Sequence, residues 1–435
     1  MPNYVELYET KKASPQKIAE LVRSGMNIYT DTATAQAPTL QDAIYTHIAA
    51  NKIKDIEVNT FLDIYPAKWY DEPVLSENLH MISWFNGNSA RKAMRNRFVD
   101  YMTTYYSEAP ALIRSCEQID MAILASSDMD EHGNFSIGIS SSMAEALLEK
   151  ADRIVLEVNR KMPKSLASPI VHITKIDRFC IVDTPLPCLP DVKPDAESVA
   201  IGNYIAEEIA NGSTLQFGVG AIPNAVGHAL RNKRNLGIHT EAFVSSMVDL
   251  IECGAIDNSR KTIHKGRSVA TFALGNQKTY NYIHNNREIE LLPVDYVNNP
   301  SVIAMNPNMI SVNGAIECDL YGQVCSESIG PYQYSGVGGQ VDFIRGAIHS
   351  KGGKSFLTFK STAKNGEVSC ILPQLQAGSI VTTTRNDVDY IVTEYGIAKL
   401  RGKPESVRAK SLIAIAHPKF RDRLTYEAKK MNLFI

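Results

Sequence analysis

The sequence predicts an α/β protein built from two open sheets, and three observations support this fold class. The chain has 435 residues, more than one ordinary domain contains. Strand-like and helix-like hydrophobic patterns alternate in both halves, as they do in parallel sheets. The run Asp183–Pro194 contains four prolines, which neither a helix nor a central strand tolerates. We therefore predict domains at residues 1–187 and 188–435, joined by an extended and exposed linker.

The N-terminal half shows one capped helix and two buried strands. Residues 14–25 are expected to form a helix, with Ser14 as its N-cap and Pro15 in its first turn. Short apolar runs at 121–126 and 153–158 are typical of strands that are buried on both faces.

The C-terminal half repeats the alternation of helix and strand. It opens with a helix that begins at Ser198 and is ended by Gly212, and its isoleucines recur at four-residue spacing and form one apolar stripe. A strand over 214–219 follows, and after a glycine-rich turn a helix over 224–232. Further strands are expected at 268–273, 355–359 and 379–384.

Composition and charge restrict the function classes. Hydrophobic residues make up 44% of the chain and charged residues 21%, as in ordinary soluble globular proteins. The 45 basic and 47 acidic side chains leave a formal net charge of −2, so bulk charge attracts neither nucleic acid nor an anionic membrane. Any phosphate-bearing ligand therefore needs a local pocket.

Cysteine usage and the terminal sequence predict the compartment. The seven cysteines are scattered and odd in number and form no C-x-x-C pair, which favours a reducing compartment and argues against a zinc ribbon. The first residues lack the basic and apolar regions of a secretory signal, and no apolar run reaches the length of a membrane span. We therefore expect a cytoplasmic protein.

One glycine-rich turn has the sequence Gln216-Phe-Gly218-Val219-Gly220-Ala-Ile-Pro223. The order strand, Gly-x-Gly, helix leaves backbone room for an anion near a helix N-terminus. Proline stands where a dinucleotide fingerprint has its third glycine, which disfavours a nicotinamide cofactor. The turn is either a pocket for a pantetheine or phosphate group or a tight corner without a ligand.

A carboxylate follows this turn in the segment Asn235-Leu-Gly-Ile-His239-Thr240-Glu241. A carboxylate at a corner between a strand and a loop can act as a nucleophile. Alternatively, Glu241 is an acid in the first turn of a helix, capped by Thr240 and stabilised by the macrodipole. His239 offers a general base, although a lone histidine more often has a structural role.

Two more segments leave alternatives open. The cluster Gly336-Val-Gly338-Gly339 precedes an expected helix, so its amides could donate to an oxyanion, or its glycines could only relieve steric strain. The segment Asp130–Asn134 has the residue types of a metal site, but acids before a glycine are also common in turns. The chain has no G-x-S-x-G elbow, which disfavours a serine hydrolase, and no P-loop motif, which excludes the usual P-loop ATPase.

Several separate motifs occur in a fixed order along almost the whole chain. They are Asn86–Lys92, Met129–Gly138, Glu157–Asn159, Gln216–Pro223, Gly237–Glu241, Val297–Pro300, Gly336–Phe343 and Val392–Gly402. With these motifs the chain resembles the acetyl-CoA hydrolase/transferase family, and most closely its 4-hydroxybutyrate CoA-transferase branch. The combination is more specific than any single motif.

The resemblance implies two similar α/β domains of the CoA-transferase fold, with the active site in a cleft between them. It implies that Glu241 is the nucleophile, and that Asn298 and an amide of the Gly338–Gly339 loop are oxyanion donors. The Asp130 segment would shape the site and would not hold a metal. The residues that would contact coenzyme A are Gln216, Gly218, Val219, Gly220, Pro223 and Lys364.

The implied reaction moves coenzyme A between an acyl-CoA, such as acetyl-, butyryl- or succinyl-CoA, and a small carboxylic acid. It passes through a glutamyl-CoA thioester with ping-pong kinetics and needs neither a metal nor a nicotinamide. Residues 26–40 and 59–65 depart from the expected family pattern, so 4-hydroxybutyrate, itaconate, succinate, acetate and butyrate all stay open as acids. The family resemblance also suggests a homodimer or a higher homo-oligomer.

Two alternatives compete with this hypothesis. An acetyl-CoA hydrolase would use the same glutamate and let water replace the second acid. A non-catalytic nucleotide- or CoA-binding sensor would need Glu241 to be no more than an acid at a helix start. A dehydrogenase is the least supported class, because of Pro223.

Overall fold

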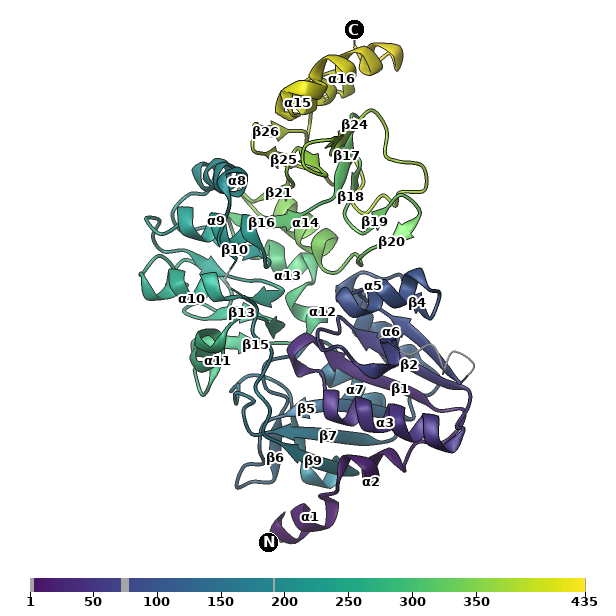
Figure 1. Cartoon of the computed structure of the whole chain (residues 1–435). Helices are drawn as coiled ribbons and strands as arrows, with labels where there is room; N and C mark the ends of the chain where they lie inside the picture. Colours follow the sequence, from purple (N-terminus) through teal and green to yellow (C-terminus); the bar gives the residue numbers. More distant parts are fainter. Residues whose placement is uncertain (1–3, 72–77, 191, 435) are drawn as a thin grey trace. The chain divides into compact units, whose positions relative to one another are not determined.

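The computed structural model describes residues 4–71, 78–190 and 192–434, which form two compact units (Figure 1). The first segment of unit 1 ends at Leu189, and the chain returns to this unit over Val269–Tyr296. Unit 2 comprises Pro190–Ser268 and the chain from Val297 onwards. The sequence-based division at residue 187 did not include the return of the chain to unit 1.

The predicted linker is irregular in the structure. Residues 183–190 and 192–195 form neither helix nor strand, and most of them are exposed. Asp191, which belongs to the same run, lies outside the described residues. The change of unit therefore falls within the proline-rich run, where backbone hydrogen bonding to a sheet is not possible at every position.

Unit 1 is built on a parallel sheet that has seven strands in its described residues, in the order β4-β3-β2-β1-β5-β7-β9. The strand order runs outwards in two directions from β1, as in doubly wound folds. Its strands are β1 (Asn27–Thr32), β2 (Ile56–Phe61), β3 (Leu79–Ser83), β4 (Val99–Tyr101), β5 (Met121–Ser126), β7 (Ile154–Asn159) and β9 (Arg178–Val182). Its helices include α1 (Tyr4–Lys11), α2 (Pro15–Ala19), α3 (Pro38–Asn51), α4 (Lys68–Asp71), α5 (Asn88–Arg95), α6 (Ala109–Ser115) and α7 (Ala144–Lys150).

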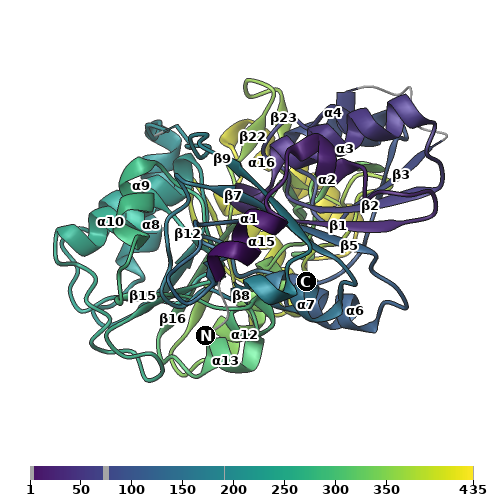
Figure 2. The ribbon, with the colours of Figure 1, turned by 90° about the horizontal axis from the view of Figure 1, so that it is seen from below.

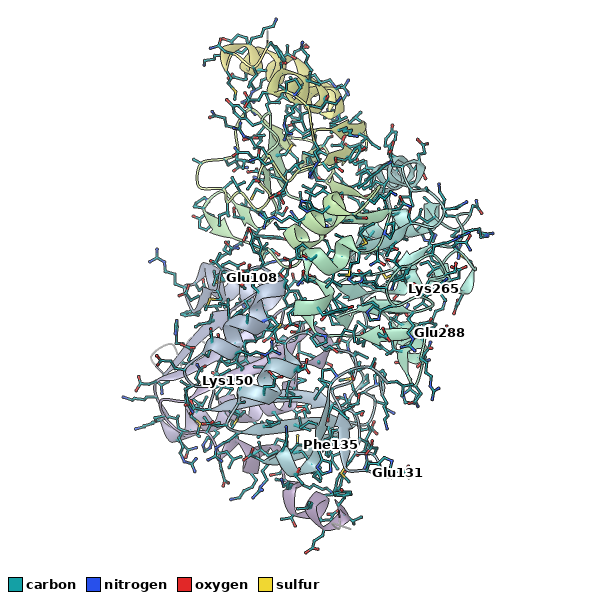
Figure 3. The ribbon with its side chains drawn as sticks, turned by 180° about the vertical axis from the view of Figure 1, so that it is seen from behind. Glu108, Glu131, Phe135, Lys150, Lys265 and Glu288 are labelled. Atoms are coloured by element: carbon teal, nitrogen blue, oxygen red, sulfur yellow. The ribbon has the colours of Figure 1, made fainter. Side chains whose placement is uncertain are left out.

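Helices cover both faces of this sheet, with α2 and α3 on one face and α6 and α7 on the other (Figure 2). Successive residues of a strand point to opposite faces, so Ile28 of β1 packs into the first core and Tyr29 into the second. Phe135, labelled in Figure 3, is fully buried in the second core. Burial on both faces explains why the central strands appear in the sequence as continuous apolar runs.

Unit 2 contains a second sheet, in the order β11-β10-β16-β21-β25-β26, in which only β26 is antiparallel to its neighbour among the described strands. These strands are β11 (Gly237–Ile238), β10 (Thr214–Phe217), β16 (Met309–Gly314), β21 (Lys354–Thr358), β25 (Tyr390–Thr393) and β26 (Gly396–Lys399). Ligands of open parallel sheets bind beyond the carboxyl ends of the strands. The helices of unit 2 include α8 (Ala196–Glu207), α9 (Ala221–Ala229), α10 (Ser245–Glu252), α13 (Pro300–Ala304), α14 (Gln340–His349), α15 (Glu405–Ile415) and α16 (Pro418–Lys430). The short helix α12 (Val294–Val297) lies where the chain passes from unit 1 back to unit 2.

Short strands extend unit 2 beyond this sheet. A three-stranded sheet contains β17 (Glu317–Asp319), β18 (Val324–Cys325) and β24 (Ile371–Leu372). Two hairpins accompany it, made of β19 (Ser328–Ile329), β20 (Tyr332–Gln333), β22 (Thr362–Ala363) and β23 (Val368–Ser369).

The predicted fold class of two α/β domains is confirmed, and so are most of the elements. The helix that begins after Ser14 is present, and the Ser14 hydroxyl accepts a hydrogen bond from the amide of Lys17 as expected of an N-cap. It ends at Ala19 and not near residue 25, because the next amides close a tighter turn onto the carbonyls of Ile18 and Ala19.

Two strand predictions need correction. The strand predicted over 379–384 is wrong, since this segment is irregular and only Thr383 forms a bridge, with Val324. Its apolar residues Ile380 and Val381 are exposed, so the pattern does not mark a buried strand. The strand predicted over 268–273 divides into β13 (Ser268–Ala270) and β14 (Phe272–Ala273).

None of the described helices combines the length and the hydrophobicity that crossing a membrane requires.

Candidate active site

Glu241 lies in a bend between β11 and β12 (Ala242–Phe243), at the carboxyl end of the unit 2 sheet. The following helix, α10, begins only at Ser245, so Glu241 is not an acid of a first helical turn. The hydroxyl of Thr240 donates to the carbonyl of Ala242 at 3.2 Å and does not cap a helix. The structure therefore contradicts the helix-start interpretation on which the sensor hypothesis depended.

Two donors from distant parts of the chain hold the carboxylate of Glu241. The amide nitrogen Nδ2 of Asn298 donates to Glu241 Oε2 at 2.8 Å. Asn298 lies in the turn between α12 and α13 and is fully buried. The backbone amide of Gly339, which directly precedes α14, donates the second hydrogen bond. The structure thus brings together three residues that the sequence analysis singled out.

The glycine at position 339 is required by its surroundings. A Cβ built on Gly339 would overlap the carboxylate of Glu241 and the amide nitrogen of Asn298. The backbone of Gly339 has φ −93°, which any residue can adopt, so the constraint is one of space. Gly338 has φ +55°, in the left-handed region that favours glycine. The glycine cluster therefore serves a close approach of backbone to carboxylate.

Burial, and to a smaller extent the neighbouring charge of Asp342, raises the pKa of Glu241 from its ordinary value to about 7. The hydrogen bonds from Asn298 and from the Gly339 amide act in the opposite direction, because they stabilise the ionised form. The outcome is a carboxylate that is more basic than an exposed glutamate and still partly ionised at neutral pH. Such a carboxylate is a better nucleophile than one with an ordinary pKa.

His239 is fully buried, and its Nε2 donates to the backbone carbonyl of Val297 at 2.7 Å. Burial and the nearby charge of Lys261 lower the pKa of His239 to about 3, so the ring is neutral. Because its single N–H is engaged by Val297, we interpret His239 as a structural tether and not as a general base. This hydrogen bond connects two site segments, because His239 lies two residues before Glu241 and Val297 directly precedes Asn298.

The glycine-rich turn borders a groove of about 420 Å³ at the carboxyl ends of β10, β16 and β21. Gly218, Val219, Gly220 and Pro223 line this groove. The helix α9 begins at Ala221, three residues earlier than predicted, so Pro223 lies in its first turn.

Gln216 takes part in the groove indirectly. Its side chain is buried, and it forms reciprocal hydrogen bonds at 3.2 Å with the amide of Asn313, which does line the groove. Asn313 and Lys360 were not identified from the sequence, although both stand at the carboxyl end of a strand, where ligand contacts are expected. Lys360 also forms an ion pair of 2.7 Å with Glu197.

Lys364 lies in the turn of the β22–β23 hairpin, where its φ is +49°. It does not line the groove of the glycine-rich turn. It lines an adjoining groove of about 650 Å³, and the two grooves have Ile316 and Cys370 in common.

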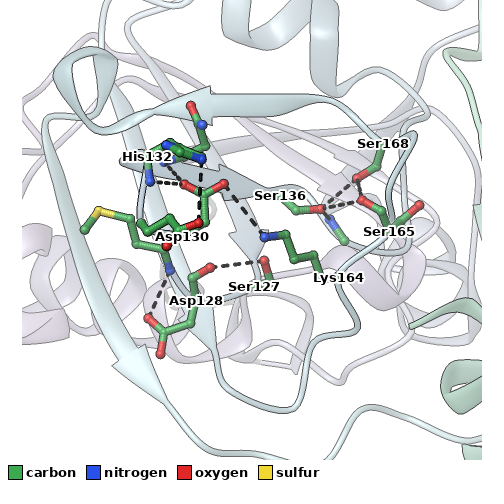
Figure 4. A network of polar contacts seen from close by, with 12 residues as sticks. Ser127, Asp128, Asp130, His132, Ser136, Lys164, Ser165 and Ser168 are labelled. Atoms are coloured by element: carbon green, nitrogen blue, oxygen red, sulfur yellow. Dashed lines mark hydrogen bonds and ion pairs between the residues drawn. The ribbon is translucent and has the colours of Figure 1, made fainter. Parts of the chain in front are cut away.

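The Asp130 segment forms a turn stabilised by its own carboxylate (Figure 4). Asp130 Oδ1 accepts hydrogen bonds from the amides of His132 and Asn134, both at 2.9 Å, and Oδ2 lies 3.8 Å from the Lys164 ammonium. These interactions lower the pKa of Asp130 against the effect of its burial. Glu131, labelled in Figure 3, is almost fully exposed. Among the described residues no group of three histidine, cysteine or acidic side chains could hold a metal ion.

The chain is similar to known proteins over almost its whole length. Residues 2–190 match the acetyl-CoA hydrolase/transferase N-terminal domain, and residues 275–428 match the C-terminal domain of the same family. The chain is 42% identical to succinyl-CoA:cyclohexane-1-carboxylate CoA transferase of Geobacter metallireducens, over 99% of this chain and 98% of that protein. It is 40% identical to 4-hydroxybutyrate coenzyme A transferase of Clostridium kluyveri, over 98% and 99%. Relatives named acetyl-CoA hydrolase are less similar, at 27% and 28% identity.

The fold is also similar to a solved structure. RipA from Yersinia pestis superposes with a TM-score of 0.94 at 37% identity, covering 99% of this chain and all of that one.

Replacing Gly339 by alanine is expected to reduce turnover by about two to three orders of magnitude, because the added Cβ displaces the Glu241 carboxylate and the amide that binds it. Gly402→Ala serves as the control, since Gly402 has φ +73° and open space around it. The control should lose stability by about 1 kcal/mol and keep its turnover. Turnover and thermal unfolding of both variants check this, and a Gly339→Ala variant with full turnover would contradict it.

Proposed function

The chain belongs to the acetyl-CoA hydrolase/transferase family, and we propose that its CoA-transferase activity moves coenzyme A from an acyl-CoA to a small carboxylic acid by way of Glu241. The single observation that carries this proposal is the half-buried carboxylate that receives hydrogen bonds from Asn298 and the Gly339 amide. This arrangement supports a nucleophile with donors already placed beside it.

The first half-reaction begins when a Glu241 oxygen attacks the thioester carbonyl. The carbonyl electron pair moves to oxygen, and Asn298 and an amide of the Gly338–Gly339 loop stabilise the charge, each worth roughly 3 kcal/mol. Collapse expels the coenzyme A thiolate and leaves an acyl-glutamyl anhydride. The thiolate then attacks the glutamyl carbonyl, which releases the first acid and leaves Glu241 as a coenzyme A thioester.

The second half-reaction reverses these steps with another acid. Its carboxylate attacks the glutamyl thioester, expels the thiolate and forms a new mixed anhydride. The thiolate attacks the carbonyl of the incoming acyl group, which yields the new acyl-CoA and restores the Glu241 carboxylate. A thioester is exchanged for a thioester, so no external energy source is needed, and the kinetics are ping-pong.

The coenzyme lies, in this proposal, along the groove of the glycine-rich turn. The groove follows the carboxyl ends of β10, β16 and β21, next to the strand that leads to Glu241. Neighbouring strands are about 4.8 Å apart, so three strands span a length suited to an extended pantetheine arm. Lys364, in the adjoining groove, would contact a phosphate at the other end of the coenzyme.

A transferase is favoured over a hydrolase because the relatives of 40% and 42% identity are named transferases and the hydrolases are more distant. Both groups would share Glu241, and they differ in whether water reaches the anhydride or the glutamyl thioester. Acids of the size of 4-hydroxybutyrate or itaconate are the proposed acceptors. We also propose a cytoplasmic homodimer or higher homo-oligomer, with the location supported by the odd cysteine count and the assembly by the family resemblance.

Incubation with acyl-CoA in the absence of an acceptor acid is expected to add coenzyme A to the peptide that contains Glu241, because the thioester intermediate then accumulates. Intact-protein and peptide mass spectrometry measure the adduct. Glu241→Gln should form none and should lose exchange. Glu207→Gln, a matched change at an exposed glutamate of α8, should behave like the unaltered protein. An adduct on any other peptide would refute the assignment.

Activity is expected to fall as the pH decreases through about 7, because Glu241 must be ionised to attack and its pKa is raised to about 7. Replacing Asp342 by asparagine removes a charge that raises this pKa, so the acid limb of kcat/KM should move to lower pH. Steady-state rates across the pH range check the direction. A limb that moves to higher pH in Asp342→Asn would be incompatible with this electrostatic account.

Lys364→Ala is expected to raise the KM for acyl-CoA about two- to five-fold with kcat unchanged, as fits an exposed contact of up to about 1 kcal/mol. An acyl-pantetheine substrate, which lacks the nucleotide phosphates, should not distinguish the variant from the unaltered protein. Lys265→Ala is the control at another exposed lysine of unit 2. Equal effects on both substrates would show that Lys364 does not contact the nucleotide end.

A further inference from the structure

Residues 334–339, here called the glycine loop, are tied at their entry to Glu327. The amides of Tyr334 and Ser335 donate to the backbone carbonyl of Glu327 at 2.7 and 3.0 Å. Glu327 is 2% exposed, and its carboxylate accepts hydrogen bonds from the Thr382 hydroxyl at 2.9 Å and from Gln333 Nε2 at 3.1 Å. A buried carboxylate with a partner on each oxygen fixes the place where the loop begins.

The end of the glycine loop is held by Gln340, whose side chain bonds to Ser326, the residue before Glu327, and to Thr383. Gln340 is the first residue of α14 and directly follows Gly339. Its Nε2 donates to Ser326 Oγ and to Thr383 Oγ1, both at 2.9 Å. Both N–H groups of the side chain amide are therefore used.

The anchors of Gln340 are themselves fixed. Thr383 is fully buried, and its backbone exchanges hydrogen bonds with Val324 of β18, each of 3.1 Å. The amide of Ser326 donates to the Thr382 hydroxyl at 3.0 Å. Hydrogen bonds therefore hold both ends of the glycine loop to residues 324–327 and 382–383, and these contacts fix the position of the Gly339 amide.

We propose that Gln340 is a positioning residue for the reaction. Through its hydrogen bonds to the hydroxyls of Ser326 and Thr383, Gln340 holds the Gly339 amide in position to donate to the Glu241 carboxylate. The inference rests on the proposed function, because it assigns Gln340 a part in the chemistry of Glu241. Gln340 does not touch the reacting atoms and acts through the backbone of its neighbour.

Gln340 is the first residue of α14, so its position directly affects that of the preceding Gly339 amide. The first amides of a helix have no intrahelical acceptor, so only loop geometry decides where they point. One peptide unit separates the Gly339 amide from the Gln340 Cα, and a displacement of about 1 Å at a catalytic group can cost up to about 100-fold in rate. A side chain that fixes this Cα therefore controls the donor.

Three variants test the proposal in the full chain. Gln340→Leu keeps the approximate shape of the side chain and removes both of its N–H donors. Thr383→Val removes the hydroxyl that accepts one of the two hydrogen bonds. Gln323→Leu is the matched control, since Gln323 Nε2 donates to Asp319 Oδ2 at 2.8 Å in another turn of unit 2. Thermal unfolding, kcat, the KM for acyl-CoA and the pH profile are measured for each.

Gln340→Leu is expected to lower kcat between about 10- and 100-fold while the KM for acyl-CoA changes little. The acid limb of its pH profile should move to higher pH, because a weaker Gly339 hydrogen bond stabilises the ionised Glu241 less. Thr383→Val should lower kcat less than Gln340→Leu does. The double variant should have the same kcat as Gln340→Leu, since the two substitutions remove the same hydrogen bond. Gln323→Leu should lose stability and keep its kcat and pH profile.

The proposal is overturned if Gln340→Leu is less stable but retains the kcat and acid limb of the unaltered protein, or if Gln323→Leu loses kcat equally. Adduct formation at Glu241 separates this failure from that of the proposed function. If Gln340→Leu and the unaltered protein form the adduct at the same rate, only the positioning role of Gln340 is refuted. If the unaltered protein forms no adduct, both proposals fall.

Discussion

The site depends on one constraint, namely that a half-buried carboxylate has two hydrogen-bond donors that come from elsewhere in the chain. Glu241 alone at the end of β11 would be neutralised by its burial. Asn298 and the Gly339 amide keep part of it ionised, and the repulsion from Asp342 keeps it basic. The balance of these effects places the pKa of Glu241 near 7, where a carboxylate is both available and reactive.

The fold supplies these groups because three chain turns meet at the carboxyl edge of one sheet. His239 joins the turn that carries Glu241 to the turn that carries Asn298, through a hydrogen bond of 2.7 Å to the carbonyl of Val297. The start of α14 brings the third group, and the absence of a side chain on Gly339 allows its backbone to reach the carboxylate. Backbone donors at a helix start also favour negative charge through the helix dipole. Under the proposed function, preorganisation is therefore a property of packing as well as of the residues proposed to react.

The sequence predicted much of this and missed the rest for physical reasons. Strands such as β5 were recognised because burial on both faces leaves an uninterrupted apolar run. Glu241 and the Gly338–Gly339 loop were singled out from their places after a strand and before a helix, and their expected roles came from the family resemblance. The segment 379–384 was assigned wrongly, because its β-branched residues fit a strand while Thr382 and Thr383 in fact serve as hydrogen-bond anchors. Asn313 and Gln340 were not predicted as functional, since their partners lie far away in the sequence and only the fold brings them together.

The central claim is that a carboxylate oxygen of Glu241 enters and leaves covalent bonds in each turnover, and oxygen-18 labelling measures this directly. When the acceptor acid carries oxygen-18 in its carboxylate, the bridging oxygen of the mixed anhydride comes from that acid and remains on Glu241 after the thiolate attacks the acyl carbonyl. The account predicts that the peptide containing Glu241 gains heavy oxygen during turnover. Continued exchange of coenzyme A with no label in that peptide would contradict it.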